Sequence, residues 1–214
     1  MTDQMCLVLA GGDAALPVDP VPHPGFVIAA DGGLAMAGRL GLEVDLVVGD
    51  LDSVDAAALD LARRNGAVVE AHPEDKDATD LELALDAAAA RGFTRVMIVG
   101  GTAIDRIDHL LANAGLVAAP RYAGLRLEWR TGPSRVVPLH DSTTVEGEPG
   151  DLVSIIPVGG SATVSSRGLQ WELAGELLDT DSSRSVSNRL TEPTAEISIS
   201  DGRALVIHTR GTSP

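Results

Sequence analysis

The chain has 214 residues, of which 44% are hydrophobic and only 2% aromatic, so it can bury one large core or two small ones built from aliphatic side chains. It carries 31 acidic and 16 basic residues, and its net charge of -15 argues against nucleic acid as a partner, because phosphate backbones bind basic surfaces. The sequence has no apolar run of membrane-spanning length, no basic leader and no export signal, so we expect a cytoplasmic protein.

The first half of the chain alternates short apolar runs with segments of helical period, the pattern of an α/β domain with a mostly parallel sheet. We expect strands at 5–10, 26–30, 46–48, 67–71, 95–99 and 125–130, and helices at 34–42, 55–65, 79–91 and from about 108 toward 120. In the third of these helices, Thr79 and Glu82 have the spacing of a capping box. Polar side chains that follow the strands should gather at the carboxyl end of the sheet.

The stretch 45–53, DLVVGDLDS, places two carboxylates directly after a buried strand. In an extended backbone Asp50 and Asp52 lie two residues apart and therefore point to the same side. Two unit charges about 4 Å apart repel by roughly 4 kcal/mol at an effective dielectric of about 20, and a divalent cation with oxygen ligands would convert that repulsion into attraction. The pair predicts a Mg²⁺ site that carries a phosphate substrate. The alternative is a polar turn in which Asp caps the next helix.

The same arrangement, an acid at a strand end or a helix start, recurs along this half of the chain. Asp31 precedes Gly32 and Gly33, a turn and helix start of the kind at which phosphates dock. Asp80 falls in the first turn of a helix, where its role could be to stabilise the helix dipole alone. If these acids reach one end of a parallel sheet, they form a single cluster of Asp31, Asp50, Asp52, Asp80 and Asp108.

Lys76 is the only lysine among the 16 basic residues, and it lies in the acid-rich stretch HPEDKDATD at 72–80. In a chain that otherwise uses arginine, this choice indicates a need for a compact ammonium group beside the acids. The competing explanation is chance.

From residue 131 onward the helical period disappears, and short strands alternate with Gly, Pro, Ser and Asp turns. We expect strands at 136–138, 143–146, 151–158, 162–165, 196–200 and 204–209. The predicted organisation is an N-terminal α/β domain, residues 1–131, followed by an all-β domain, residues 132–214, that is sandwich-like or an open barrel. In the second domain Trp171 is either a core residue or a ring that stacks on a cationic heterocycle.

Taken in order, seven short motifs resemble the thiamin pyrophosphokinase family across nearly the whole chain. They are ADGG at 30–33, VGDLDS at 48–53, DKDATD at 75–80, RIDHLLAN at 106–113, GDLVSIIPVG at 150–159, GLQWEL at 168–173 and SN at 187–188. The resemblance implies an α/β domain that binds ATP and Mg²⁺, a β domain that binds thiamin, and a homodimer whose active sites lie between subunits.

The resemblance also implies roles for individual residues. The implied Mg²⁺ ligands are Asp31, Asp50, Asp52 and Asp80. The implied nucleotide-binding residues, with Lys76 and Arg106 on the phosphates, are Gly32, Gly33, Lys76, Thr79 and Arg106. The implied catalytic residues are Asp50, Asp52, Asp80 and Asp108. Asp108 lies near the thiamin hydroxyl in this assignment, and the rest of the thiamin pocket comprises Trp171, Ser187 and Asn188.

The implied reaction is the transfer of pyrophosphate from ATP to the hydroxyl of thiamin, giving thiamin diphosphate and AMP. Two alternatives stay open: a pyrophosphokinase for another alcohol, such as a hydroxymethylpterin, and a nucleotide- or thiamin-binding sensor with impaired catalysis. The sensor is suggested by one departure from the family pattern. Where such proteins usually have glycines before the Arg-x-Asp-His run, this chain reads Thr102-Ala103-Ile104-Asp105 and is one residue longer. The set of five acids argues against a sensor, because a mere binder has little need of them.

Overall fold

The computed structural model describes residues 4–12, 14–102 and 105–211, and the chain divides into two compact units. The first unit comprises the chain up to Asn113 together with Gly124–Gly132, and the second comprises Ala114–Ala123 and the chain from Pro133. Ala103 and Ile104, at the centre of the departure from the family pattern, lie outside the described residues. Within the described ranges, no helix has the length and hydrophobicity needed to cross a membrane.

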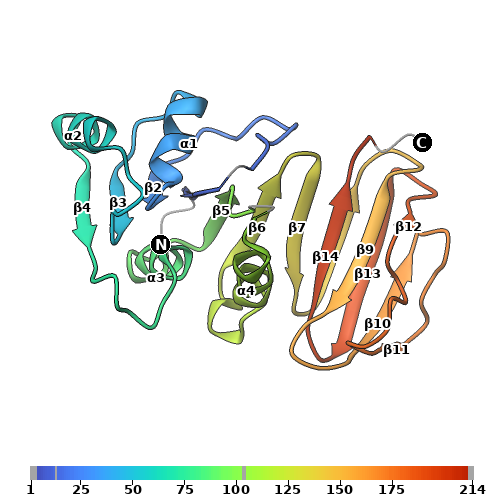
Figure 1. Cartoon of the computed structure of the whole chain (residues 1–214). Helices are drawn as coiled ribbons and strands as arrows, with labels where there is room; N and C mark the ends of the chain where they lie inside the picture. The colour runs from blue at the N-terminus through green and yellow to red at the C-terminus, as the bar shows by residue number, and fades with distance from the viewer. Residues whose placement is uncertain (1–3, 13, 103–104, 212–214) are drawn as a thin grey trace. The chain divides into compact units, whose positions relative to one another are not determined.

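The first unit is an α/β domain built on a parallel sheet (Figure 1). Its strands are β1 (Met5–Ala10), β2 (Phe26–Ala30), β3 (Leu46–Gly49), β4 (Val68–Ala71), β5 (Arg95–Val99) and β6 (Arg126–Thr131). They lie in the order β6-β5-β1-β2-β3-β4, and all five pairings are parallel. The chain runs outward from β1 to β4 and then crosses back to β5. Its connections therefore diverge at the carboxyl edge beside β1, where open α/β sheets bind ligands.

Helices cover both faces of this sheet (Figure 1). They are α1 (Gly33–Leu40), α2 (Ala56–Arg64), α3 (Asp80–Ala90) and α4 (Ile107–Val117), and the short 3-10 helix Pro120–Tyr122 follows α4. Residues Leu7 and Leu9 of β1 share a core with side chains of α1 and α2, whereas α3 packs against β1, β2 and β3 from the other face. Strands β1, β2 and β3 are buried on both faces, which explains their continuous apolar runs. Gly33 lets α1 start against β1, because a Cβ atom there would lie 1.9 Å from the carbonyl oxygen of Leu9.

The second unit is a sandwich of two antiparallel sheets. One sheet has the order β7-β14-β9-β12 and the other β11-β10-β13-β8. The strands are β7 (Ser134–Leu139), β8 (Ser142–Glu146), β9 (Leu152–Pro157), β10 (Ala162–Arg167), β11 (Glu176–Leu178), β12 (Asn188–Arg189), β13 (Thr194–Asp201) and β14 (Ala204–Thr209). Ile155 and Val206 of the first sheet share one core with Val164 and Ile197 of the second. The predicted fold class, α/β followed by an all-β sandwich, is confirmed; the short strands β11 and β12 were not predicted.

A buried hydrogen-bonded pair, His208 and Asp151, lies at one end of the sandwich. His208 near the end of β14 lies 2.8 Å, Nε2 to Oδ2, from Asp151, which directly precedes β9. The same carboxylate accepts hydrogen bonds from the backbone N–H groups of Glu148 and Gly211. Burial raises the pKa of Asp151, but these hydrogen bonds and His208 together lower it more, so the pKa lies below its ordinary value. The pair thus anchors the turn before β9 to the chain after β14.

Candidate active site

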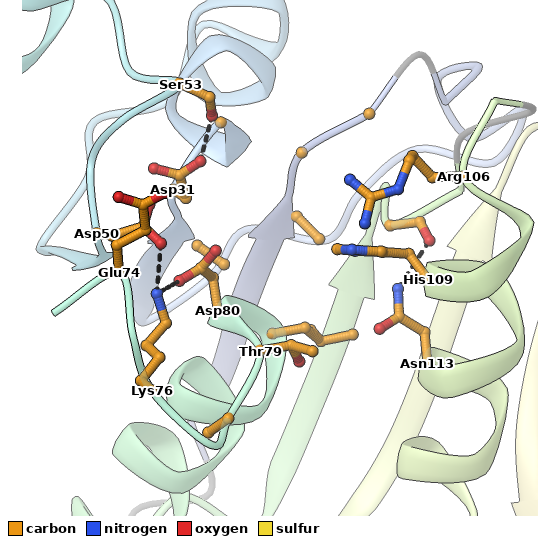
Figure 2. A pocket seen from close by; sticks show the side chains of 18 residues that line it. Asp31, Asp50, Ser53, Glu74, Lys76, Thr79, Asp80, Arg106, His109 and Asn113 are labelled. Carbon is orange, nitrogen blue, oxygen red and sulfur yellow. Dashed lines mark hydrogen bonds and ion pairs between the residues drawn. The ribbon is translucent and has the colours of Figure 1, made fainter. Parts of the chain in front are cut away.

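A pocket of about 390 Å³ lies at the carboxyl edge of the parallel sheet (Figure 2). Its walls come from the turns after β1, β2, β3, β4 and β5 and from the first two turns of α4. We call it the acidic pocket, and its polar side chains are Asp31, Asp50, Ser53, Glu74, Lys76, Thr79, Asp80, Arg106, His109 and Asn113. Figure 2 shows the carboxylates on one side and Arg106, His109 and Asn113 on the opposite side. The predicted convergence of acids from separate strand ends is therefore present for Asp31, Asp50 and Asp80.

Three carboxylates lie close enough together to share a cation. One oxygen from each of Asp31, Asp50 and Asp52 falls within 4.8 Å of the others. Asp31 is only 9% exposed; its Oδ2 accepts a hydrogen bond from Ser53, while its buried Oδ1 has no hydrogen-bond partner among the described residues. A buried carboxylate oxygen without a donor is costly, and a bound cation would satisfy it. The all-oxygen donor set fits a hard divalent ion.

The pKa shifts in this cluster follow from its charges. A hydrogen bond from Lys76 is the main cause that holds the pKa of Asp50 below its ordinary value. The negative charge of Asp50 is in turn the main cause that raises the pKa of Asp52 above its ordinary value. The two acids therefore repel each other as their spacing in the sequence predicts, and the neighbouring ammonium relieves only Asp50.

Lys76 bridges two of the acids. Its Nζ lies 2.6 Å from Asp50 Oδ2 and 3.0 Å from Asp80 Oδ1, and its side chain is only 13% exposed (Figure 2). The lysine comes from the loop after β4, Asp50 follows β3, and Asp80 begins α3. The prediction that the sole lysine accompanies the acidic cluster agrees with this arrangement.

Gly49 permits the acids to approach so closely. It has a φ of 147°, and a Cβ atom built on it would lie 3.0 Å from Asp31 Cβ and 3.0 Å from Asp80 Oδ1. Any larger residue would press on both side chains. The end of β3 therefore has to lack a side chain for the ends of β2 and β3 and the start of α3 to converge.

Thr79 and Asp80 begin α3 as the capping-box spacing predicts. The Thr79 hydroxyl oxygen accepts a hydrogen bond of 3.3 Å from the backbone N–H of Glu82. Asp80 is the first residue of the helix, so its carboxylate lies at the positive end of the helix dipole. The sequence offered this role as an alternative to ligand binding, and the geometry allows both at once.

The run Arg106–Asn113 contributes the opposite wall of the acidic pocket. Arg106, His109 and Asn113 line it, and their spacing of three and four residues places them on one helical face. His109 and Asn113 were not predicted as site residues, although their spacing within RIDHLLAN indicates a shared helical face. Asn113 is buried and donates a hydrogen bond of 2.9 Å to the carbonyl oxygen of Gly101, which fixes the turn after β5.

Asp108 does not line the acidic pocket. Its carboxylate is paired with the guanidinium of Arg106 at 3.0 Å, and its side chain is 66% exposed. The hydrogen bonds from Arg106 are the main cause that lowers the pKa of Asp108 to about 2. Asp108 is therefore ionised at neutral pH, and its predicted place beside the thiamin hydroxyl stays a prediction.

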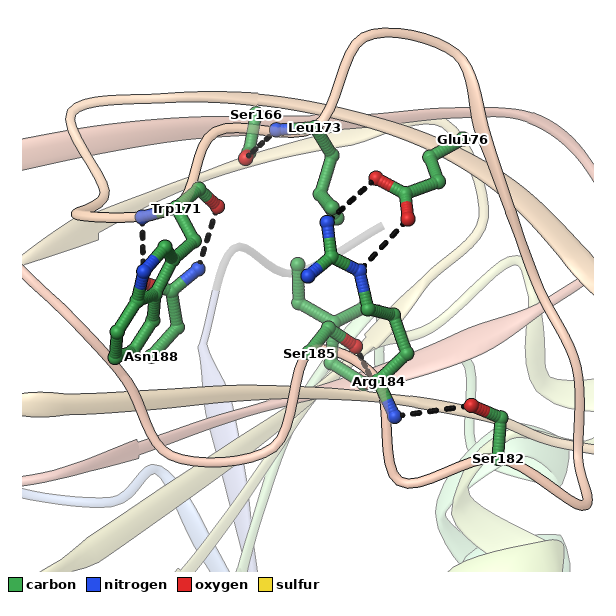
Figure 3. Close-up of polar contacts among 9 residues, drawn as sticks. Ser166, Trp171, Leu173, Glu176, Ser182, Arg184, Ser185 and Asn188 are labelled. Carbon is green, nitrogen blue, oxygen red and sulfur yellow. Dashed lines mark hydrogen bonds and ion pairs between the residues drawn. The ribbon is translucent and has the colours of Figure 1, made fainter.

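In the second unit, Asn188 holds the loop that carries Trp171 (Figure 3). The Asn188 Oδ1 accepts hydrogen bonds from the backbone N–H groups of Trp171 (3.1 Å) and Arg189 (2.9 Å), and its Nδ2 donates one to the Trp171 carbonyl oxygen (2.7 Å). Asn188 is 2% exposed and Trp171 is 51% exposed. Trp171 is thus not a core residue, whereas the other tryptophan, Trp129, is buried. Asn188 therefore fixes the backbone of the residue that carries the exposed ring, and its own side chain is buried.

The segment before Asn188 has an unusual backbone. Ser185 and Ser187 have φ values of 71° and 59°, in a region that residues other than glycine rarely adopt. The segment is attached to β9, because Ser187 N–H donates to the hydroxyl of Ser154 and the Ser185 hydroxyl donates to the Ile155 carbonyl oxygen. Such strained residues cluster at ligand-binding sites. The predicted thiamin residues Trp171 and Ser187 therefore lie on loops whose conformation is fixed by hydrogen bonds.

Two family models match the chain. Residues 22–128 match "Thiamin pyrophosphokinase, catalytic domain", and residues 142–204 match "Thiamin pyrophosphokinase, vitamin B1 binding domain". The first match contains the acids, Lys76 and the α4 wall of the acidic pocket, and the second contains Trp171 and Asn188. A search of curated protein sequences gives no match.

Solved structures of similar proteins extend over both units. A thiamin pyrophosphokinase family protein from Enterococcus faecalis is 25% identical, with a TM-score of 0.83, and the match covers 98% of this chain and 100% of that one. A thiamine pyrophosphokinase from Bacillus subtilis is 22% identical, with a TM-score of 0.83, over 96% and 99% of the two chains. The thiamin pyrophosphokinase from Candida albicans shares 12% identity and a TM-score of 0.78 over 97% and 89%. The two matches with lower identity show that the fold is shared.

Proposed function

The chain belongs to the thiamin pyrophosphokinase family, and we propose that its acidic pocket is the site at which pyrophosphate passes from ATP to thiamin. ATP-dependent pyrophosphorylation of thiamin is the activity that both family matches support. The observation that carries the assignment of the site is the convergence of Asp31, Asp50 and Asp52, with oxygens within 4.8 Å of one another, at the ligand-binding edge of a parallel sheet. A triphosphate binds at such an edge only if its charge is neutralised, and these acids can recruit the cation that does so.

We propose that Asp31, Asp50 and Asp52 hold Mg²⁺, with Asp80 as a further ligand. The buried Oδ1 of Asp31, which has no hydrogen-bond partner in the described part of the chain, supports this assignment, as do the mutual repulsion of Asp50 and Asp52 and the all-oxygen donor set of the cluster. Bound Mg²⁺ supplies electrostatic stabilisation of the charge that develops on the phosphate oxygens. The residues of the chain determine where that charge develops, and they exclude other arrangements of the reacting groups.

The nucleotide is proposed to bind between the two walls of the acidic pocket. Gly32 and Gly33 offer backbone close to the start of α1, Thr79 retains a hydroxyl hydrogen to donate, and Arg106 faces the acids with a guanidinium that can bind phosphate in a bidentate manner. In the proposed reaction the thiamin hydroxyl attacks the β-phosphorus in line with the departing AMP. Holding both groups in this geometry is the main contribution of the protein.

Asp108 is proposed to orient the thiamin hydroxyl by accepting its hydrogen bond. A carboxylate with a pKa of about 2 is a weak base, so the structure favours this orienting role over removal of the proton. In the β unit the exposed indole of Trp171 is proposed to stack on the cationic ring of thiamin, with Ser187 beside it and Asn188 behind it. In this assignment residues 1–131 form the catalytic domain and residues 132–214 the thiamin-binding domain.

We propose in addition a homodimer with active sites between its subunits, and a cytoplasmic location. The dimer is supported by the resemblance to the family and by two large apolar side chains of α4, Ile107 and Leu111, which are one helical turn apart and 63% and 67% exposed. Light scattering during size-exclusion chromatography tests it, and a monomer at micromolar concentration would contradict the proposal.

The decisive experiment identifies the products. The purified chain is incubated with thiamin, ATP and Mg²⁺, and the adenine nucleotides and thiamin species are resolved chromatographically. We expect AMP and thiamin diphosphate in equal amounts; ADP with thiamin monophosphate would contradict pyrophosphoryl transfer. Asp50→Asn should reduce turnover by at least about 100-fold with an unchanged circular dichroism spectrum, because it removes a charged ligand of the proposed cation. Asp60→Asn, an exposed change on α2, is the matched control and should stay active.

A further inference from the structure

Lys76 pairs with two of the carboxylates that are proposed to bind the cation. Its ammonium is 2.6 Å from Asp50 Oδ2 and 3.0 Å from Asp80 Oδ1, and the side chains of Lys76 and Asp50 are only 13% and 16% exposed. Both aspartates belong to the proposed metal site, so this inference rests on the proposed function. We propose that Lys76 is a built-in competitor of the divalent cation, and that the nucleotide phosphates draw it away and thereby couple cation binding to nucleotide binding.

The carboxylates of Asp50 and Asp80 cannot bind the Lys76 ammonium and a divalent ion at the same position. Asp50 has two oxygens: Oδ2 binds the ammonium, and Oδ1 is 3.4 Å from the backbone N–H of Asp52. Asp80 Oδ1, the other partner of Lys76, faces Gly49 and Asp31 at the end of β2. A divalent ion bound by both Asp50 and Asp80 would therefore lie within a few ångströms of the Lys76 ammonium. At such distances the two positive charges repel each other strongly.

Lys76 competes as a cation. Its Nζ contacts two carboxylates, Asp50 at 2.6 Å and Asp80 at 3.0 Å, and a lysine that pairs with two acids is an ammonium at neutral pH. The lysine has to move, and its four-carbon stem, which extends from a loop, allows this.

The phosphates of a bound nucleotide can release Lys76 from the two acids. Lys76 lines the acidic pocket together with Arg106, so an anionic phosphate chain bound there offers the ammonium a new partner. When the ammonium moves to phosphate, Asp50 and Asp80 regain free oxygens for the cation. Because linkage is reciprocal, the nucleotide then strengthens cation binding by the same factor by which the cation strengthens nucleotide binding.

The test measures Mn²⁺ binding by electron paramagnetic resonance, without nucleotide or thiamin, so that it does not depend on turnover. Lys76→Met removes the competitor and should lower the Kd for Mn²⁺ by at least about tenfold, because charge-assisted hydrogen bonds to both acids no longer have to be broken. Lys76→Arg keeps the charge and should not tighten binding. Arg63→Met, which removes an exposed positive charge on α2, is the control for the change in net charge.

The same titration is repeated with a non-hydrolysable ATP analogue. We expect the analogue to tighten Mn²⁺ binding strongly in the unmodified chain and much less in Lys76→Met. An unchanged or weaker affinity for Mn²⁺ in Lys76→Met, with Asp50→Asn still reducing it, would overturn the competition and leave the metal assignment intact. If Asp50→Asn also binds Mn²⁺ like the unmodified chain, both the competition and the proposed metal ligands are wrong. Circular dichroism of each variant confirms that it is folded.

Discussion

Replacing Asn188 by alanine should separate support of the proposed thiamin pocket from chemistry at the proposed phosphate site. The side chain is buried and makes three hydrogen bonds, two of them to the backbone of Trp171 and one to that of Arg189. It lies in the β unit, whereas the acidic pocket belongs to the α/β unit. Its loss should therefore loosen the loop of Trp171 without altering the acids.

The size of the effect follows from these contacts. Each of the three hydrogen bonds contributes about 0.5–1.5 kcal/mol net, so Asn188→Ala should lower the free energy of unfolding by roughly 1.5–4.5 kcal/mol. If the indole stacks on the cationic ring of thiamin, loss of its fixed position costs up to about 2 kcal/mol of binding, which corresponds to a rise in KM for thiamin of up to about 30-fold. KM for ATP should change little, because no contact of Asn188 reaches the acidic pocket.

Urea unfolding, KM for each substrate and tryptophan fluorescence measure these effects. Trp171 is half exposed and Trp129 is buried, so a Trp171→Phe background isolates the emission that does not depend on the loop. Asn188→Asp keeps an acceptor oxygen for both backbone N–H groups but replaces the donor by a carboxylate oxygen that faces the Trp171 carbonyl oxygen in a buried site, so it should also be less stable than the parent. An unchanged KM for thiamin together with a normal free energy of unfolding, or an equal rise in both KM values, would refute the reasoning.

Two further predictions concern other parts of the chain. Gly49→Ala should cost about 1–3 kcal/mol of stability and weaken Mn²⁺ binding, because φ is 147° at this position and an added Cβ atom, 3.0 Å from Asp31 Cβ and 3.0 Å from Asp80 Oδ1, would force both side chains to shift. Calorimetry measures both effects, and normal Mn²⁺ affinity would contradict the crowding. Asp151 has a lowered pKa in the folded state, so its contribution is present above the unfolded value of about 3.9 and is lost as pH falls through the folded value. The stability difference between the parent chain and Asp151→Asn, measured by urea unfolding, should therefore shrink in acid, and a constant difference from pH 7 to pH 3 would show that the carboxylate is not the cause.

The parallel sheet and the gathering of acids could be predicted because both depend on short-range pattern. Apolar runs that are buried on both faces define the strands, and the carboxyl ends of parallel strands lie at one edge, so Asp31 and Asp50 must approach each other. The start of α3 could also be predicted from the sequence, because Thr79 and Glu82 are three residues apart and interact within one helical turn. In such cases the local sequence already contains the interacting partners.

The side of α4 that lines the pocket could not be fixed in the same way. Asp108 was selected because it is acidic, yet the residues that line the pocket are Arg106, His109 and Asn113. Which face of a helix meets a pocket depends on the residue at which the helix starts, and α4 begins at Ile107, close to the departure from the family pattern. A shift of one residue turns the helix face by about 100°.

The role of Asn188 could not be predicted because its partners are distant in sequence. Its side chain bonds the backbone of Trp171, 17 residues earlier, across a connection that contains the short strand β11. The sequence identifies Asn188 and Trp171 as candidate binding residues. Only the structure, which brings their two chain segments together, shows that Asn188 supports the backbone of Trp171.

The position of Lys76 also bears on how the chain folds in the cell. The α/β unit brings Asp31, Asp50 and Asp80 together from distant points of the sequence, and the ammonium that pairs with two of them is part of the same chain. The unit therefore carries its own counter-ion into the folded state and need not wait for a metal ion before its sheet closes. We therefore expect a newly synthesised chain to fold without magnesium, since Lys76 already pairs with two of these acids.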